Sequence, residues 1–155
     1  HLIDATAGLL NDTYSLQRLG FPLTSYEANP LLALLILADS LLKTSFKQLG
    51  TKWNFKPVSF DSAELTATAK DAYTVILYDP MFNVKNHKSL PSLEMQILSE
   101  LENEYPNSAL TESEFAKWRE VAQVIVVKRP DKAPYLLDVF PKYSINSKLL
   151  RWDIY

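Results

Sequence analysis

The residues best suited to chemistry lie in one short segment, Tyr78–Phe82 (YDPMF), which follows the apolar run 75–77. Asp79 supplies a carboxylate and Pro80 a backbone carbonyl, so two hydrogen-bond acceptors are adjacent in the chain. Phe82 adds an aromatic ring that can stack on a flat heterocycle. The segment therefore places two acceptors and one aromatic ring at one sheet edge, although an ordinary strand-ending Asp-Pro turn with a packing phenylalanine is the competing interpretation.

A second candidate site combines the turn after the first expected strand with the end of the second strand. Gly20 and Gly50 each follow a helical pattern and suit helix ends, which leaves Gly8 in the strand-to-helix turn. In open α/β sheets this turn binds nucleotide-like ligands, and Glu27 at the end of the second strand can accept hydrogen bonds from two ribose hydroxyls. The pair predicts a nucleoside-containing cofactor. A nicotinamide dinucleotide is the weaker option, because the G-x-G-x-x-G pattern for a pyrophosphate is missing.

The composition excludes several classes of function. Cysteine is absent and only two histidines occur, so disulfides, thiolate nucleophiles and the usual zinc ligand sets are excluded and no metal site is predicted. The longest apolar run, 31–38, is too short to cross a bilayer, and no signal segment opens the chain. We therefore expect a soluble, cytoplasmic protein with no membrane partner.

The elements that must position these residues follow an alternating order. Apolar, β-branched runs alternate with helical patterns, which predicts βαβ units and a mostly parallel sheet. Residues Lys142–Ile145 and Leu149–Ile154 predict a closing antiparallel pair. The other expected strands are Leu2–Thr6, Leu23–Tyr26, Val58–Phe60, Tyr73–Tyr78 and Val121–Val127, and helices are expected from 11 to 20, from 30, from 91 to 102 and from 112 to 120.

Two helix starts can be predicted in detail. Asn11 or Asp12 can cap the first helix, and Asn29 can cap the second helix, which has Pro30 in its first turn. The second helix should cover the sheet with the residues that recur at helical spacing, namely Leu31, Leu34, Leu35, Ala38, Leu41 and Leu42.

No repeat or linker divides the sequence, so we expect a single domain over residues 1–155. An N-terminal region is expected before it, because the chain begins inside a strand-like run.

The charge distribution suggests a surface for phosphate. The net charge of -2 argues against a broadly basic nucleic-acid binder, but residues 121–155 carry six Lys or Arg against three Asp. Lys85 and Lys88 follow the segment Tyr78–Phe82, whereas Lys128 and Arg129 follow the fifth expected strand. Because the carboxyl ends of parallel strands share one sheet edge, these four cations are candidate phosphate contacts. Ordinary solvated loop charge is the alternative.

Five stretches along the chain, taken together, resemble a known family. They are LIDATAGLLND (2–12), YEANP (26–30), YDPMFNVKNHKS (78–89), VIVVKRPDKAP (124–134) and RWDIY (151–155). In this order they resemble the small-subunit (16S) ribosomal RNA guanine-N2 methyltransferases of the RsmJ type, and D-P-P-Y segments similar to that at Asp79 occur in amino-group methyltransferases. The resemblance implies a Rossmann-like class I methyltransferase fold, S-adenosylmethionine (SAM) as methyl donor, and a guanine of ribosomal RNA or of the small ribosomal subunit as acceptor.

The resemblance also implies roles for individual residues. Beside Gly8, it places Asn11 and Asp12 at the cofactor, Glu27 and Ala28 near its ribose, Asp61 and Ser62 near its adenine, and Asp79 beside its reactive end. Asp79, Pro80 and Phe82 would then hold the guanine, and no dedicated general base is implied. Two residues depart from the family pattern, because Leu10 stands in place of a usual second glycine and Asn11 in place of a usual arginine. A non-catalytic RNA- or cofactor-binding module on the same fold is the alternative function.

Overall fold

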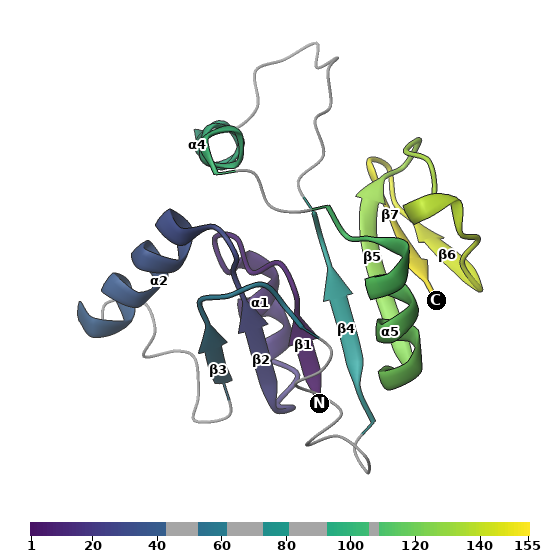
Figure 1. Ribbon diagram of the computed structural model, residues 1–155, viewed down its shortest axis with the longest axis horizontal. Coiled ribbons are helices and arrows are strands. Elements are labelled where there is room, and N and C mark those ends of the chain that lie inside the picture. The colour runs from purple at the N-terminus through teal and green to yellow at the C-terminus, as the bar shows by residue number, and fades with distance from the viewer. Residues whose placement is uncertain (43–52, 62–72, 81–92, 106–108) are drawn as a thin grey trace.

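A computed structural model of the chain describes residues 1–42, 53–61, 73–80, 93–105 and 109–155. Within these ranges, seven strands form one sheet in the order β3-β2-β1-β4-β5-β7-β6 (Figure 1). The first five strands are parallel, and β7 is antiparallel to both β5 and β6. The strands are β1 (Leu2–Asp4), β2 (Leu23–Tyr26), β3 (Trp53–Lys56), β4 (Val75–Tyr78), β5 (Val124–Pro130), β6 (Tyr143–Asn146) and β7 (Leu150–Ile154). The predicted parallel sheet with an antiparallel C-terminal pair is therefore confirmed.

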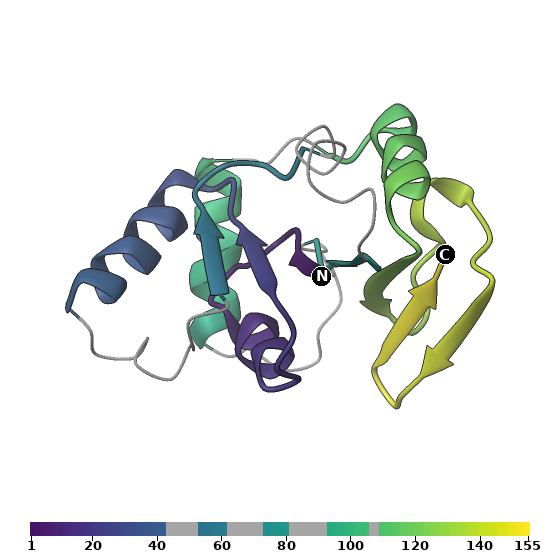
Figure 2. The same cartoon turned by 90° about the horizontal axis from the view of Figure 1, so that it is seen from below.

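The helices cover both faces of the sheet. In the described ranges they are α1 (Asn11–Gln17), α2 (Pro30–Leu42), α4 (Leu93–Glu104) and α5 (Glu112–Val121), with a short 3-10 helix at Leu136–Asp138. Phe115 and Trp118 of α5 pack with Ile125 and Val127 of β5 in the main core. Figure 2 shows α1 on the opposite face from α5. None of the helices in the described ranges is long and apolar enough to span a bilayer.

The parallel pairing brings the carboxyl ends of β1, β4 and β5 to one edge. Asp4 of β1 is in register with Leu77 of β4, and Tyr78 of β4 with Val127 of β5. The chain order reverses between β1 and β4, because β2 and β3 lie on one side of β1 and the later strands on the other. Such a reversal leaves a crevice at the carboxyl ends of the strands, which is where open α/β sheets bind ligands.

The third strand differs from the prediction. We expected it at Val58–Phe60, but β3 spans Trp53–Lys56 and pairs with β2. Residues 53–56 alternate between aromatic and polar types, which suits an edge strand, and the Trp53 indole donates a hydrogen bond to Ser25 Oγ at 3.1 Å. Pro57 has no amide hydrogen for the ladder and follows the last residue of the strand.

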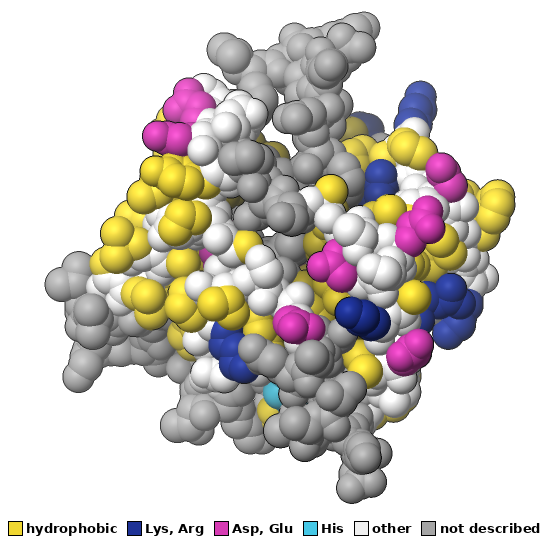
Figure 3. All heavy atoms as spheres, viewed as in Figure 1, with side chains coloured by type: hydrophobic (Ala, Val, Ile, Leu, Met, Phe, Trp, Pro, Cys, Tyr) yellow, Lys and Arg dark blue, Asp and Glu magenta, His cyan; other side chains and the backbone are white. Residues whose placement is uncertain are grey.

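The buried face of α2 also differs from the prediction. The structure buries Leu32, Ala33 and Ile36, whereas Leu34 and Leu35 are 61% and 56% exposed. Leucine occupies so many positions of this helix that spacing alone does not single out a face. The predicted cap at Asn29 is confirmed, because its Oδ1 accepts from the amides of Leu31 and Leu32. Figure 3 shows the exposed hydrophobic side chains gathered over α2.

The first helix begins differently from the prediction. Its N-cap is Leu10, not Asn11 or Asp12, and Leu10 adopts the left-handed conformation at φ 64°. An L-residue pays about 1–2 kcal/mol for this conformation. The Leu10 side chain is nevertheless 3% exposed and packs with Ala7 and Ile36. Packing of the Leu10 side chain therefore offsets the backbone strain at this position.

We expect Leu10→Gly to be more stable than Leu10→Ala by about 1 kcal/mol, because only glycine relieves the left-handed strain. Both variants should be less stable than the wild type, since each loses a buried leucine side chain. Urea unfolding of the three proteins measures the order. Ala116→Gly, on the exposed side of α5, is the control. At this helical position glycine should be less stable than alanine, by about 1 kcal/mol. If Leu10→Ala is as stable as Leu10→Gly, or more stable, Leu10 does not have the left-handed conformation.

Candidate active site

Three charged side chains from three elements meet at the carboxyl edge of the sheet. The Lys128 Nζ of β5 donates to Asp79 Oδ2, just past β4, and to Asp12 Oδ2 of α1, each at 2.9 Å. The three side chains are half-buried, with exposed fractions of 21% for Lys128, 32% for Asp79 and 36% for Asp12. The fold therefore joins a predicted catalytic residue, a predicted cofactor residue and a predicted phosphate contact in one ion-paired cluster.

The backbone around Asp79 is fixed by β1. The Asp79 amide donates to Thr6 Oγ1 at 2.8 Å, and the Ala5 amide donates to the Leu77 carbonyl at 2.9 Å. Burial raises the pKa of Asp79, and hydrogen bonding to Lys128 opposes that rise. For Lys128, burial lowers the pKa, but the bonds to Asp79 and Asp12 outweigh it, so the pKa is raised overall. The lysine is thus held in its charged form beside a carboxylate that is costly to ionise.

Asp4 is a third carboxylate, close to this cluster. It is 1% exposed, its Oδ2 accepts from the Thr13 hydroxyl of α1, and its Oδ1 accepts from the Thr6 amide. Thr13 also shares a 3.0 Å hydrogen bond with Ser25 of β2. Burial raises the pKa of Asp4 to about 6, against the opposing effect of the two hydrogen bonds. Asp4 therefore ties α1 to the strand ends that carry the site.

The raised pKa of Asp4 predicts a pH-dependent stability. Since the folded-state pKa is above the unfolded value, ionisation of Asp4 costs stability as the pH rises from about 4 to about 6, and the loss is complete above that range. We expect Asp4→Asn to remove this loss. The difference in unfolding free energy between variant and wild type should change by about 2 kcal/mol in favour of the variant between pH 4 and pH 7. Urea unfolding across this range measures it, and parallel curves for the two proteins would contradict the raised pKa.

Glu27 and Gly8 lie together, as their predicted shared site requires. Glu27 is 4% exposed, and its carboxylate accepts from the amides of Gly8 at 2.8 Å and Asn29 at 2.7 Å. Gly8 has φ 52°, a conformation that favours glycine. The Asn29 Nδ2 donates to the Leu101 carbonyl of α4. Glu27 thus joins the turn after β1 to the start of α2, and it also organises the backbone of the site.

The other predicted site residues are exposed, half-buried, part of β5, or outside the described ranges. Asn11 and Asp61 are exposed, and Ala28 is half-buried next to Glu27. Pro80 is half-buried after Asp79. Arg129 is 8% exposed within β5, and Lys128 is ion-paired, so neither placement favours a phosphate contact, which stays a prediction for both. Four predicted residues lie outside the described ranges, namely Ser62, Phe82, Lys85 and Lys88.

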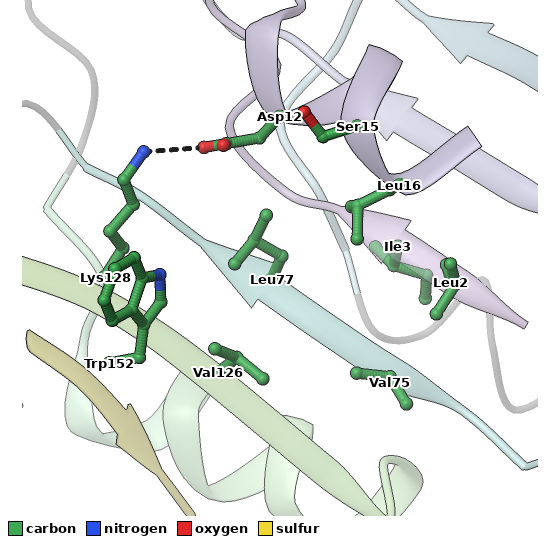
Figure 4. Close-up of a pocket in the computed structure, with 10 residues that line it drawn as sticks. All are labelled: Leu2, Ile3, Asp12, Ser15, Leu16, Val75, Leu77, Val126, Lys128 and Trp152. Carbon is green, nitrogen blue, oxygen red and sulfur yellow. Dashed lines mark hydrogen bonds and ion pairs between the residues drawn. The ribbon is translucent and has the colours of Figure 1, made fainter. Parts of the chain in front are cut away.

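A cavity of about 250 Å³ extends from this cluster along the α1 face of the sheet (Figure 4). Asp12 and Lys128 lie at one end of it, with Trp152 beside the lysine. Its walls are mainly apolar and come from α1 and four strands, with Leu16, Leu77 and Val126 among the lining residues. Of the predicted cofactor residues, it includes Asp12 but not Gly8 or Glu27. Within the described part of the chain, no group of three His, Cys, Asp or Glu side chains could hold a metal ion.

Sequence reasoning missed Asp4, Thr6 and the ion-paired role of Lys128. A signal for Asp4 existed, because a carboxylate at the end of an otherwise apolar parallel strand must be buried and needs partners. The positions of Thr6 and Lys128 depend on the pairing order of β1, β4 and β5. That order had no direct signal in the sequence.

The donors and acceptors at the edge fit SAM. An ionised carboxylate can accept about four hydrogen bonds, and the amides of Gly8 and Asn29 account for two of them at Glu27. The amino-acid end of SAM carries both an ammonium and a carboxylate, and Asp12 of the cluster can pair with the ammonium. The left-handed turn at Gly8 brings backbone close to the same edge. These groups match the polar parts of the cofactor in type and sign.

Comparison with known proteins agrees with this geometry. The family described as "Putative SAM-dependent methyltransferase" matches residues 1–155, the whole chain. The chain is 34% identical over 155 residues to the ribosomal RNA small subunit methyltransferase J of Hahella chejuensis and 32% identical over 160 residues to that of Actinobacillus pleuropneumoniae serotype 5b. It covers 57% and 61% of the lengths of these two relatives, and they cover 100% and 99% of the chain.

A solved structure shares the fold. The crystal structure of a SAM-dependent methyltransferase from Neisseria gonorrhoeae aligns with a TM-score of 0.66 and 24% sequence identity, and the match covers 99% of this chain and 64% of that one. At this identity the likeness concerns the fold. It agrees with the Rossmann-like methyltransferase fold expected from the sequence.

Proposed function

Because this chain belongs to the family of SAM-dependent methyltransferases that matches its whole length, we propose that it transfers a methyl group from SAM to the N2 amino group of a guanine in 16S ribosomal RNA. The observation that carries the proposal is the position of Asp79. It follows the last residue of β4, beside the strand ends of β1 and β5, at the edge that also holds Gly8 and Glu27. In this proposal the site for the guanine amine adjoins the site for the nucleoside of SAM, as methyl transfer between them requires. The names of the relatives support ribosomal RNA as the substrate.

In this proposal SAM supplies the reactive group, and the protein binds and positions the reactants. Bound SAM supplies a methyl group already activated by its sulfonium. Gly8, Asn11, Asp12, Glu27 and Ala28 hold the cofactor, with Asp61 and Ser62 near its adenine. The protein then has to place the guanine nitrogen in line with the carbon-sulfur bond and exclude water.

The guanine is held by the Asp79 segment. The N2 lone pair is delocalised into the ring, so the nitrogen is a poor nucleophile. The Asp79 carboxylate and the Pro80 carbonyl accept its two hydrogens and favour a pyramidal nitrogen, which frees the lone pair. Phe82 stacks on the base. The nitrogen-carbon bond forms as the carbon-sulfur bond breaks, and the amine proton leaves to solvent after the transfer.

The RNA is proposed to bind beside this edge, with Lys85 and Lys88 on its phosphates. Residues 1–155 would act as a single domain in the cytoplasm, on naked RNA or on the small ribosomal subunit. The chain spans about 60% of the length of these relatives. Ribosomal RNA as the substrate of this chain is therefore part of what we propose.

The test separates an enzyme from a non-catalytic binding module. Purified protein is incubated with SAM labelled in its methyl group and with unmethylated small-subunit ribosomal RNA, and label on the RNA is counted. We expect transfer that depends on both protein and SAM. Tight binding of RNA and S-adenosylhomocysteine without any transfer would favour the module instead.

A further inference from the structure

Lys128 lies inside the candidate active site and not on an open basic surface. Its ammonium donates to the carboxylates of Asp79 and Asp12, which come from two other segments of the chain. A solvated lysine that serves as a phosphate contact has no need of two carboxylate partners. Its stem lines the cavity with Leu77, Val126 and Trp152 (Figure 4).

The register of the sheet fixes this position. Tyr78 is paired with Val127, so Asp79 and Lys128 each follow a paired residue on neighbouring strands. On its other side Lys128 is paired with Trp152 of β7. The lysine backbone is thus held by two strands, and Asp79 by the Thr6 hydroxyl that accepts from its amide. The contact between ammonium and carboxylate follows from sheet pairing, without a loop rearrangement.

We propose that Lys128 is a positioning residue, which holds Asp79 as an ionised acceptor and engages its Oδ2 so that Oδ1 is left for the amine of the substrate. This role rests on the function proposed for Asp79, but its central step, the effect of Lys128 on the Asp79 carboxyl, does not depend on which substrate is methylated. Lys128 donates to Asp79 Oδ2 at 2.9 Å, and both this hydrogen bond and the lysine charge lower the pKa of that carboxyl.

The charges around Asp79 explain why a cation is needed. Asp12 on α1 and Asp4 on β1 are both carboxylates close to it, and burial already raises its pKa. A protonated Asp79 would carry a hydroxyl hydrogen and lose part of its capacity to accept the amine hydrogens. Lys128 on β5 is the group that opposes these effects.

The direct test is a carbon-13 NMR titration of the Asp79 carboxyl in the wild type and in Lys128→Met. We expect the midpoint to move up by about one pH unit in the variant, because the nearby cation is lost. Lys128→Arg, which keeps the charge, should stay near the wild type. Lys148→Met removes an exposed lysine from the β6–β7 turn and should leave the titration unchanged. An unchanged midpoint in Lys128→Met overturns the proposal, whatever the substrate of the enzyme is.

Kinetics supply the second test. For Lys128→Met we expect kcat to fall by about 10- to 100-fold and the acid limb of its pH profile to move upward, with the KM for RNA and the salt dependence of RNA binding retained. Partial rescue in Lys128→Arg should follow. If kcat is retained while KM rises and the salt slope falls by about one, Lys128 is a phosphate contact and the proposal is wrong. Lys128→Gln, a polar residue of similar length, takes the place of Lys128→Met in both tests if the latter does not fold.

Discussion

Asp79→Ala is expected to reduce methyl transfer by about 100- to 1,000-fold, which is the usual loss for one well-placed polar group in a transition state. The carboxylate is half-buried at the strand end, and its known partner is Lys128, which keeps its second ion pair with Asp12. The loss of one exposed or half-exposed ion pair changes stability by about 1 kcal/mol or less. Transfer of labelled methyl to small-subunit ribosomal RNA, with thermal melts of the same samples, measures both effects.

Two variants control the Asp79 experiment. Asp79→Asn keeps one acceptor oxygen without the charge and should retain more activity than the alanine variant. Glu120→Ala removes an exposed carboxylate from α5 and should behave like the wild type. A folded Asp79→Ala protein that transfers methyl at the wild-type rate would remove Asp79 from the mechanism.

Glu27→Ala should weaken the binding of S-adenosylhomocysteine by about 1.5 to 3 kcal/mol, or roughly 10- to 150-fold in Kd, through the loss of hydrogen bonds to a charged acceptor. The same change should also lower stability, because the amides of Gly8 and Asn29 lose the acceptor they share. Isothermal titration calorimetry measures the affinity, at a temperature where melts show the variant to be folded.

Glu27→Gln separates the two effects of this residue. It retains the length of the side chain and one acceptor oxygen, so we expect an affinity between those of the wild type and the alanine variant. The exposed Glu120→Ala again provides a control for general loss of a carboxylate. Equal affinity in the wild type and in folded Glu27→Ala would mean that Glu27 only supports the backbone of the turn.

The sequence predicted the parallel sheet well because its strands are short, apolar and bounded by clear helix signals. Asn29 and Pro30 marked the start of α2, and the alternating apolar and polar residues near the C-terminus marked the antiparallel pair. It failed at β3, where a short run at Val58–Phe60 competed with the aromatic pair of Trp53 and Phe55. It also failed at the buried face of α2, since a helix with leucine on every side has no distinct apolar stripe.

The candidate site was predicted in part. Asp79, Gly8 and Glu27 could be found because each ends or follows an expected strand, and parallel strands share one edge. The pairing of Lys128 with Asp79 and Asp12 could not be found, because it depends on β5 being the neighbour of β4 and on α1 lying over the same edge. Lys128 is followed by Arg129 in the sequence, which suggested that both residues lie on a charged surface. Because side chains alternate along β5, Lys128 and Arg129 instead lie on opposite faces of the sheet.

The most direct test of the account is to identify the nucleoside that the protein produces. Small-subunit ribosomal RNA is treated with the protein and labelled SAM, digested to nucleosides and separated by liquid chromatography with mass spectrometry. We expect the label to be recovered as N2-methylguanosine, and Asp79→Ala to abolish most of it. Label on a ring carbon, on a ribose or on another base would contradict the assignment of the Asp79 segment to a guanine amine.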